Sequence, residues 1–170
     1  MSATELIYSK SALWVQDNVR VAGIKSVTPP ALTAQIGNYQ PAWMDMPIPV
    51  DTGMSAMQLE YKAACDIDVL SLFGIVAGGN SRAIIKRTFK DTANSFHTWT
   101  EEFEGIVGTI TSDETTVSGQ EGVGMSVTMN LSYYKLTIDG TVTVEIDPAH
   151  MIRSINGVNQ LQAEKDAFNM

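Results

Sequence analysis

Apolar and polar residues alternate along much of the chain, which is typical of strands with one buried face. The clearest stretch covers residues 123–133, where Met125, Val127 and Met129 fall on the apolar side. The opposite side of this stretch carries small neutral polar residues. They are Ser126, Thr128, Asn130 and Ser132. We expect a long strand here, with one side in the core and the other facing water or a partner.

The same reasoning predicts further strands. Residues 54–63 alternate cleanly and predict a strand with one buried side. Residues 11–28 hold two short apolar stretches around a polar turn, and residues 82–90 and 96–110 form a second candidate pair. Residues 31–39 can also extend, although their alternation is imperfect.

The alternation changes phase after Tyr133, because Lys135 takes an apolar position and Leu136 and Ile138 become the apolar pair. A bulge or bend near Tyr134 would produce this change. The dipeptide Asp139-Gly140 between two apolar stretches predicts a hairpin turn, and Pro148 predicts the end of the returning strand.

Two segments have a helical period instead. In residues 66–73, Ile67, Leu70 and Phe73 lie three positions apart, with Asp66 suited to the N-cap and Gly74 to the end. A short terminal helix is expected over residues 159–168. Its expected cap is Asn159, and its expected apolar-side residues are Leu161, Lys165 and Phe168.

Residues 41–53, PAWMDMPIPVDTG, form a proline-rich segment with unusual apolar content. The prolines exclude a helix and a central strand, so we expect a long loop. One interpretation is a loop folded over its own core. The other is an arm that packs on a neighbouring subunit, with Trp and Met as anchors.

Together these elements predict roughly eight mostly antiparallel strands in a sandwich or barrel-like fold with a helix at its flank. The length of 170 residues favours one domain spanning residues 1–170. Within it we expect an extended loop at 41–53, a polar surface loop at 112–122 and a short terminal helix or tail at 159–170.

Charge and composition narrow the function. The net charge of −8 argues against a module that grips nucleic acid, while it allows a surface past which DNA moves without sticking. No apolar run approaches the roughly 20 residues of a membrane span, and the first residues lack a secretory signal pattern. The single cysteine, Cys65, cannot form an internal disulfide, which fits assembly in a reducing cytoplasm.

No catalytic or cofactor motif stands out. His97 and His150 lack a recognisable nucleophile setting, and we interpret both as surface or interface histidines. Cys65 is either a small buried residue or a thiolate beside a helix start. The acidic residues Glu101, Glu102 and Glu104 crowd one strand without the separation of a glycosidase pair. We therefore expect no enzyme activity, no metal site and no cofactor.

Several motifs do resemble one family. SYYKLTIDG (residues 132–140), VEIDP (144–148) and INGVNQL (155–161) match, in order and spacing, the major tail tube protein of contractile-tailed bacteriophages and the tube protein of contractile bacteriocins. VLSLFG (69–74) and GNYQPAWMDMPIPVDTGM (37–54) are also similar. The matching positions in the latter are Tyr39, Met44, Asp45, Pro47, Asp51, Gly53 and Met54, whereas Pro41, Ala42 and Trp43 depart from the family pattern.

The resemblance implies a β-sandwich-like domain with a flanking helix and a long loop. Hexameric rings would join their inner sheets into a continuous β-barrel and stack into a rigid tube inside a contractile sheath. The tube would cross the host envelope and conduct DNA during genome ejection. The implied location is the tail tube of the virion, assembled in the bacterial host cytoplasm.

The implied partners are other copies of the chain, the sheath protein, baseplate or tube-initiator and terminator proteins, the tape measure protein in the lumen, and DNA in transit. A membrane anchor is not expected. Two alternatives remain: the tube of a genome-free contractile bacteriocin or secretion-type injection system, and a monomeric β-sandwich binding module.

Two sets of site residues follow. The first is the inter-subunit or inter-ring loop, comprising Tyr39, Trp43, Met44, Asp45, Met46 and Ile48. The second is the candidate lumen lining, where small hydroxyls and negative charge would let a polyanion slide. It comprises Glu102, Glu104, Ser126, Thr128, Asn130 and Ser132.

Overall fold

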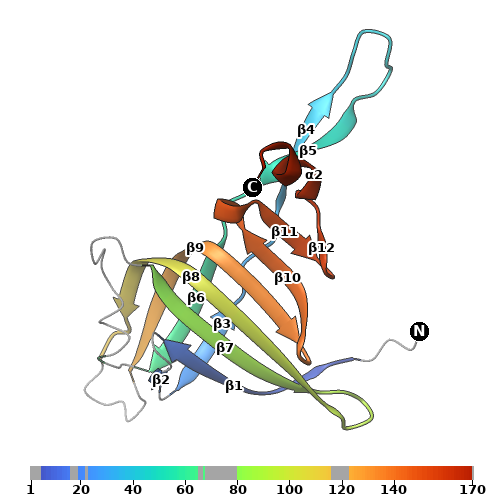
Figure 1. The fold of residues 1–170 in the computed structure, drawn as a ribbon. Helices are drawn as coiled ribbons and strands as arrows, with labels where there is room; N and C mark the ends of the chain where they lie inside the picture. Colours follow the sequence, from blue (N-terminus) through green and yellow to red (C-terminus); the bar gives the residue numbers. More distant parts are fainter. Residues whose placement is uncertain are drawn as a thin grey trace.

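The structure is a computed structural model that describes residues 5–15, 19–21, 23–64, 67, 80–115 and 123–169. Antiparallel strands dominate these residues, with a short 3-10 helix η1 (Pro148–His150) and a helix α2 (Gln162–Ala167) near the end (Figure 1). The strands are β1 (Ile7–Val15), β2 (Val19–Val21), β3 (Ile24–Thr28), β4 (Ala34–Tyr39), β5 (Ile48–Met54), β6 (Gln58–Ala64), β7 (Ser81–Lys90), β8 (Phe96–Ser112), β9 (Gly124–Ile138), β10 (Thr141–Asp147), β11 (Ile152–Ile155) and β12 (Val158–Asn159).

One branched sheet contains every described strand except β4 and β5. Its main path runs β12-β11-β10-β9-β8-β7-β1-β2, and β6 joins β9 on the side that β10 also uses, with β3 beyond it. The long strand β9 therefore serves two neighbours in turn. Residues 124–130 pair with β6, and residues 134–138 pair with β10. The described strands of this sheet do not close into a barrel within one chain.

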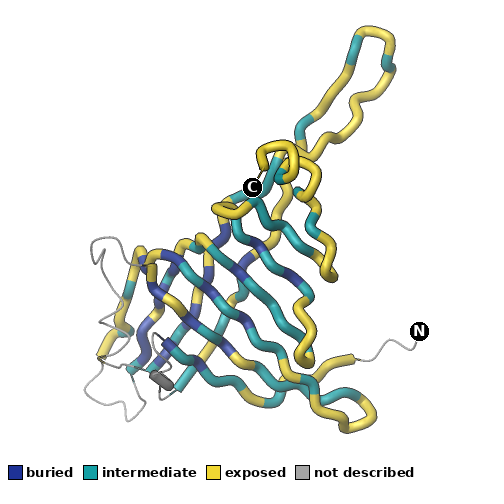
Figure 2. Tube along the Cα trace, viewed as in Figure 1, coloured by how far each residue is buried: buried dark blue, intermediate teal, exposed yellow. Residues whose placement is uncertain are grey.

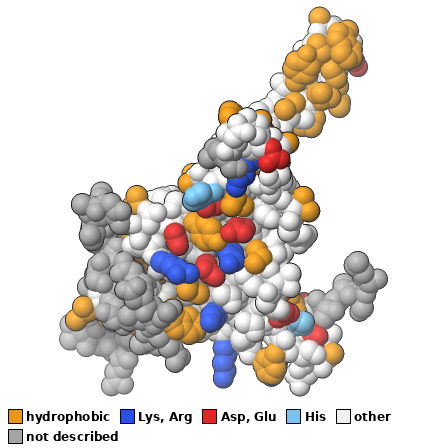
Figure 3. Space-filling view, in the orientation of Figure 1, with side chains coloured by type: hydrophobic (Ala, Val, Ile, Leu, Met, Phe, Trp, Pro, Cys, Tyr) orange, Lys and Arg blue, Asp and Glu red, His pale blue; other side chains and the backbone are white. Residues whose placement is uncertain are grey.

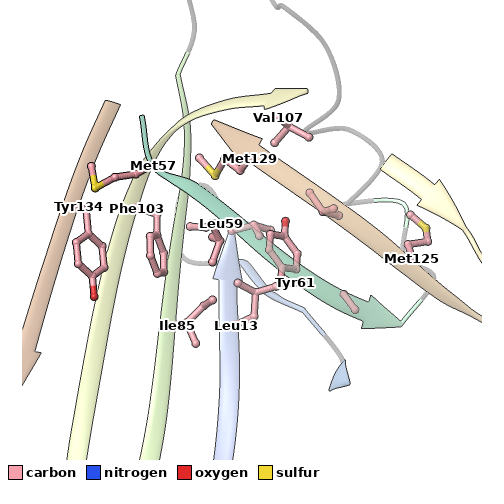
Figure 4. Packing of buried hydrophobic residues seen from close by; sticks show 14 of the residues in the cluster. Leu13, Met57, Leu59, Tyr61, Ile85, Phe103, Val107, Met125, Met129 and Tyr134 are labelled. Carbon is pink, nitrogen blue, oxygen red and sulfur yellow. The ribbon is translucent and has the colours of Figure 1, made fainter. Parts of the chain in front are cut away.

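The core lies between β6 with the first half of β9 on one side and β1, β7 and β8 on the other. Leu59 and Tyr61 of β6 point toward Leu13 of β1 and Ile85 of β7 (Figure 4). Phe103 of β8 stacks on Tyr134 of β9 with ring centroids 5.4 Å apart. The predicted apolar face of residues 123–133 is confirmed, since Met125, Val127 and Met129 are all buried.

A β-bulge explains the phase change in β9. Gly105 of β8 pairs with Leu131 while Glu104 pairs with Tyr133, so Ser132 is the extra residue. The bulge lies two positions before the predicted Tyr134. A glycine is needed at position 105, because a Cβ there would overlap the main-chain oxygen of Asn130.

Most of the predicted turns and pairs agree with the structure, but the second apolar stretch of residues 11–28 divides into β2 and β3, and β3 pairs with β6. β1 pairs with β2 and β7 with β8, and β9 returns as β10 through Asp139-Gly140, both with positive φ. β10 ends before Pro148 as expected. The terminal helix is shorter than predicted, and its N-cap is Leu161. Asn159 instead accepts from the main-chain N–H groups of Arg153 and Leu161, outside the helix.

The proline-rich segment contains a strand, which corrects our expectation of a loop over residues 41–53. Residues 48–54 form β5, which pairs with β4 into a two-stranded hairpin that projects from the body (Figure 1). Prolines are tolerated because the hairpin is not paired to any other described strand. We call residues 34–54 the arm. Apart from residue 67, the predicted helix over 66–73 lies outside the described residues, and so does most of the predicted 112–122 loop.

Candidate assembly surfaces

The tip of the arm presents large apolar side chains that none of the other described residues covers. Trp43 is 83% exposed and Met46 is 70% exposed, and Figure 3 shows hydrophobic side chains covering the arm. Figure 2 shows that exposure runs along most of its length. The interpretation of this segment as a loop folded over its own core is therefore wrong.

The tip has a defined shape despite its exposure. The side-chain amide of Gln40 donates to the main-chain oxygens of Met44 (3.1 Å) and Asp45 (3.3 Å). The N–H of Met44 donates to the oxygen of Pro41 at 3.0 Å. These bonds fix the turn that presents Trp43 and Met46. Tyr39 and Ile48 face each other where the two strands meet this turn, and both are exposed.

The root of the arm is tied to the body by an ion pair. Arg153 of β11 donates to both carboxylate oxygens of Asp51, at 2.6 and 3.4 Å. These hydrogen bonds, together with the N–H of Gly53, hold the pKa of Asp51 below its usual range. Beside this pair lies an apolar pocket of ≈ 310 Å³, whose lining includes Met54, Met57, Leu131, Met151 and Leu161.

The second surface is the outer face of four strands, β3, β6, residues 124–130 of β9 and residues 106–112 of β8. We call these strands the ribbon. Directly paired residues of antiparallel strands share a face, and the pairing places Thr128 between Glu60 and Thr109. In the same way, Ser126 lies between Lys62 and Thr111. This face points away from the buried residues of the ribbon.

The structure divides the six candidate lumen residues into two groups. Ser126, Thr128 and Asn130 lie on the ribbon, and Ser132 is in the bulge at its end. Glu102 and Glu104 lie on the same face of the sheet but beyond the bulge, where β8 pairs with β7.

Glu102 and Glu104 are neutralised by nearby cations. Arg82 lies 2.8 Å from Glu102 and 3.9 Å from Glu104, and Lys135 lies 4.0 Å from Glu102. Figure 3 shows positive and negative side chains interspersed on the face over β7 to β10. This part of the sheet is a mixed ion-pair surface and not a continuous acidic wall.

The ribbon also has two strand edges without a described partner. β3 pairs only with β6 among the described strands. Residues 106–112 of β8 pair with β9 on one side, while the pairing of β8 with β7 stops at Gly105. Unpaired edges expose main-chain N–H and C=O groups that another strand can satisfy.

Among the described residues, no three His, Cys, Asp or Glu side chains are grouped so that they could hold a metal ion, and none of the helices has the length and apolar content of a membrane span. His97 contacts Asp91 and Asp139, and His150 contacts Asp147. Cys65 lies outside the described residues.

One acidic residue from the sequence analysis is buried. Glu101 is 1% exposed, and Arg87 reaches its carboxylate at 2.6 Å while the hydroxyl of Tyr134 donates to it at 3.2 Å. Burial raises the pKa of Glu101, and the Arg87 guanidinium opposes this rise. Since the carboxylate is enclosed by these groups, its role is to join β7, β8 and β9.

Sequence reasoning missed several members of both surfaces. Glu60, Lys62, Thr109 and Thr111 face the same side of the ribbon as Thr128, and the alternation in residues 54–63 already separated the first two from the core. The Asp51–Arg153 pair joins residues 102 positions apart, so only the fold brings it together.

Comparisons with known proteins agree with this architecture. The family model described as phage tail tube protein FII matches residues 9–168. The tail tube protein of Escherichia phage P2 is 28% identical over 145 residues, which cover 83% of this chain and 84% of that protein.

Solved structures share the fold at low identity. A chain of the sheath–tube complex of an extracellular contractile injection system, PVC, in its extended state has a TM-score of 0.56 at 10% identity, covering 75% of this chain and 88% of that chain. A chain of the anti-feeding prophage cap has a TM-score of 0.58 at 10% identity, covering 82% and 94%. With the family match extending over nearly the whole sequence, the chain belongs to the phage tail tube protein FII family and is a structural tube subunit.

Proposed function

We propose that copies of this chain close into hexameric rings, that the rings stack through the arm, and that the resulting tube conducts DNA. The observation that carries this proposal is the pair of edges, on opposite sides of one ribbon, that have no partner among the described strands. Such edges aggregate unless they are covered or paired. Rotational symmetry closes them without leaving an end.

The strand directions support ring closure. Each neighbouring pair in the ribbon, β3–β6, β6–β9 and β9–β8, is antiparallel. The two outer strands, β3 and β8, therefore run in opposite directions. When a rotation places residues 106–112 of one copy beside β3 of the next, the new pair is antiparallel as well. The ribbons would then form one continuous barrel wall.

The arm supports stacking. It extends beyond the body from the end of β3 and the start of β6 (Figure 1), so it continues the direction of ribbon strands. Its uncovered residues Trp43 and Met46 are types enriched in protein interfaces. We propose that Tyr39, Trp43, Met44, Asp45, Met46 and Ile48 contact a subunit of the neighbouring ring.

The outer face of the ribbon supplies the lumen in this proposal. Ser126, Thr128 and Asn130 present small neutral groups, with Thr109 and Thr111 beside them. Lys62 also faces this side, but Asp113 pairs with it at 2.7 Å, so the surface offers DNA phosphates few free cations. Glu102, Glu104 and Ser132 adjoin this lining in the proposal, and the Arg82 and Lys135 ion pairs reduce the repulsion that the two glutamates exert.

The remaining proposed partners are suggested by the proteins to which this chain is similar. The structurally similar chains come from complexes whose descriptions include a sheath, a baseplate and a tube-terminating cap. We propose equivalent sheath, baseplate and terminator contacts here, together with a tape measure protein in the lumen, assembly in the host cytoplasm and a structural role without enzyme activity. The phage family match favours the virion tube over a genome-free injection system and over a monomeric binding module.

Disulfide trapping tests ring closure. In a Cys65→Ala background, Ser26→Cys on β3 is combined with Thr109→Cys or with Thr111→Cys on β8, all on the same sheet face. One of the two combinations should give a ladder of covalent oligomers that ends at the hexamer. Each single-cysteine variant is the control and should give dimers at most. No ladder from either combination, in particles that electron microscopy shows to be rings, would refute the β3–β8 junction.

Two further variants test stacking and lumen. Trp43→Ser with Met46→Ser should leave the fold intact and prevent ring stacking, and unfolding of this variant would contradict the assignment of the arm.

Thr128→Lys should permit tube assembly while slowing DNA passage, because each added cation binds phosphate. Normal genome ejection from Thr128→Lys particles would place this face outside the lumen.

A further inference from the structure

One histidine is held between two carboxylates at the end of the sheet where two turns meet. Nδ1 of His97 lies 2.7 Å from Oδ2 of Asp139, and Nε2 lies 3.5 Å from Oδ2 of Asp91. Asp91 begins the turn between β7 and β8, and Asp139 begins the turn between β9 and β10. We call these three residues the clasp. It is separate from both assembly surfaces.

Each carboxylate uses one oxygen to accept from main-chain N–H groups, in its own turn for Asp91 and on β8 for Asp139, and its other oxygen faces the histidine. Oδ1 of Asp91 accepts from the N–H groups of Ala93 and Ser95. Oδ1 of Asp139 accepts from the N–H of Thr98 at 2.7 Å. The remaining oxygen of each aspartate faces a ring nitrogen of His97. Movement of the imidazole is therefore coupled to the main chain of both turns.

The arrangement requires a protonated imidazole. A carboxylate only accepts hydrogen bonds, so both ring nitrogens must carry hydrogen to satisfy both partners. A neutral imidazole has one N–H, which leaves its other nitrogen lone pair facing a carboxylate. The longer contact, to Asp91, is then the one expected to break.

The other groups around His97 do not compensate. Phe89 of β7 is its cross-strand partner, and Tyr8 of β1 packs edge-on against Phe89. Arg87, the next charged group on this face of β7, is engaged with Glu101 and lies over the Trp99 ring. Lys90 belongs to the opposite face, where its ammonium lies over Phe96.

We propose that the clasp is a pH-dependent contact between the β7–β8 and β9–β10 turns. The contact is formed when His97 is an imidazolium and is broken when His97 loses one proton. Hydrogen bonds to Asp139 first and Asp91 second raise the pKa of His97 above its ordinary 6.5. The same contacts contribute to lowering the pKa of both carboxyl groups below 3.8.

The directions of these pKa shifts define the pH range in which the clasp is closed. A raised histidine pKa gives stability that is complete below the unfolded value and is lost as pH rises through the folded pKa. Lowered carboxyl pKa values give stability that is lost as pH falls through the folded values. The clasp is therefore closed between about pH 4 and 6.5 and opens on the alkaline side as His97 loses its proton.

An NMR titration of the unassembled full chain tests the proposal. His97 should titrate above 6.5. The amide signals of Ser95 and Thr98 should shift with the same midpoint as His97, and the shift should be larger for Ser95. Asp139→Asn and Asp91→Asn keep Oδ1 as an acceptor and remove the charge, and Asn tolerates the positive φ at 139. Both should lower the His97 pKa, the former variant more.

His150 provides an internal control, since its described contact is with one carboxylate, that of Asp147 at 2.6 Å. Its ring signals should be unaffected by either substitution. The proposal is overturned if His97 titrates at the same pH in all three proteins. It is also overturned if Ser95 and Thr98 do not respond while His97 titrates.

Discussion

The arm and the ribbon use the same antiparallel pairing but treat their apolar residues in opposite ways. In the ribbon, Leu59 and Val127 are buried because β1 and β7 cover them. In the arm, Ile36 and Trp43 stay exposed because neither face is covered by another element that the structure describes. Alternation thus predicts which apolar side chains need a partner surface. The fold determines whether that surface comes from the same chain.

Removing a large core side chain should show the greatest difference between the two regions. Phe103→Ala should cost about 3–5 kcal/mol of unfolding free energy, because it deletes a fully buried ring stacked on Tyr134. Trp43→Ala should change the stability of the unassembled chain by less than about 0.5 kcal/mol. Chemical denaturation measures both. Equal losses would mean that the arm is part of the core.

The buried ion pair offers the next largest effect. Arg87→Met leaves Glu101 enclosed without its cation, which raises the pKa of Glu101 further, and should cost about 3 kcal/mol. The double variant Arg87→Met with Glu101→Met removes the charge and should recover part of the loss. A double-mutant cycle from denaturation curves gives the coupling. A double variant less stable than Arg87→Met would show that the charge itself is not the cause.

The bulge gives a smaller effect with a matched control. Gly105→Ala forces the added Cβ against the main chain of Asn130 and should destabilise by about 1–3 kcal/mol. Gly23→Ala places its Cβ 3.8 Å from Ala64, an ordinary contact, and should be close to neutral. Thermal unfolding compares the two. Similar unfolding midpoint temperatures for the two variants would mean that β8 and β9 can separate at this point without a loss of stability.

The smallest effect concerns the root of the arm. Asp51→Asn removes the charge that Arg153 holds, so the arm should vary more in its angle to the body while global stability is retained. Because the pKa of Asp51 is lowered, the wild-type contact is present above 3.8 and weakens as pH falls through the lower folded value. Distance distributions between spin labels on arm and body measure this angle. An unchanged distribution would assign arm orientation to other contacts.

Much of the fold could be predicted from sequence because its signals are local. Asp139-Gly140 specifies a tight turn, and Met125, Val127 and Met129 reveal their face by spacing alone. The arm strand was missed because Pro47 and Pro49 indicate a loop, although a hairpin with no further strand tolerates them. The bulge was expected two residues late because the position of Gly105 depends on register with another strand.

The site residues were less predictable because they depend on distant pairings. Thr128 was selected correctly as a polar-face residue, but its neighbours Glu60 and Thr109 come from strands far apart in sequence. Glu102 and Glu104 suggested a negative wall, and the contacts of Arg82 became visible only when β7 paired with β8. No local pattern around His97 indicates its contacts with carboxylates, because its partners Asp91 and Asp139 lie on two turns 48 positions apart by residue number.

Cryo-electron microscopy of the purified chain at high concentration tests the central claim most directly. We predict stacked rings in which residues 106–112 of β8 lie antiparallel to β3 of the next copy, with Trp43 buried against a neighbouring ring. A chain that remains monomeric at every concentration, or rings in which both ribbon edges stay unpaired, would contradict the account.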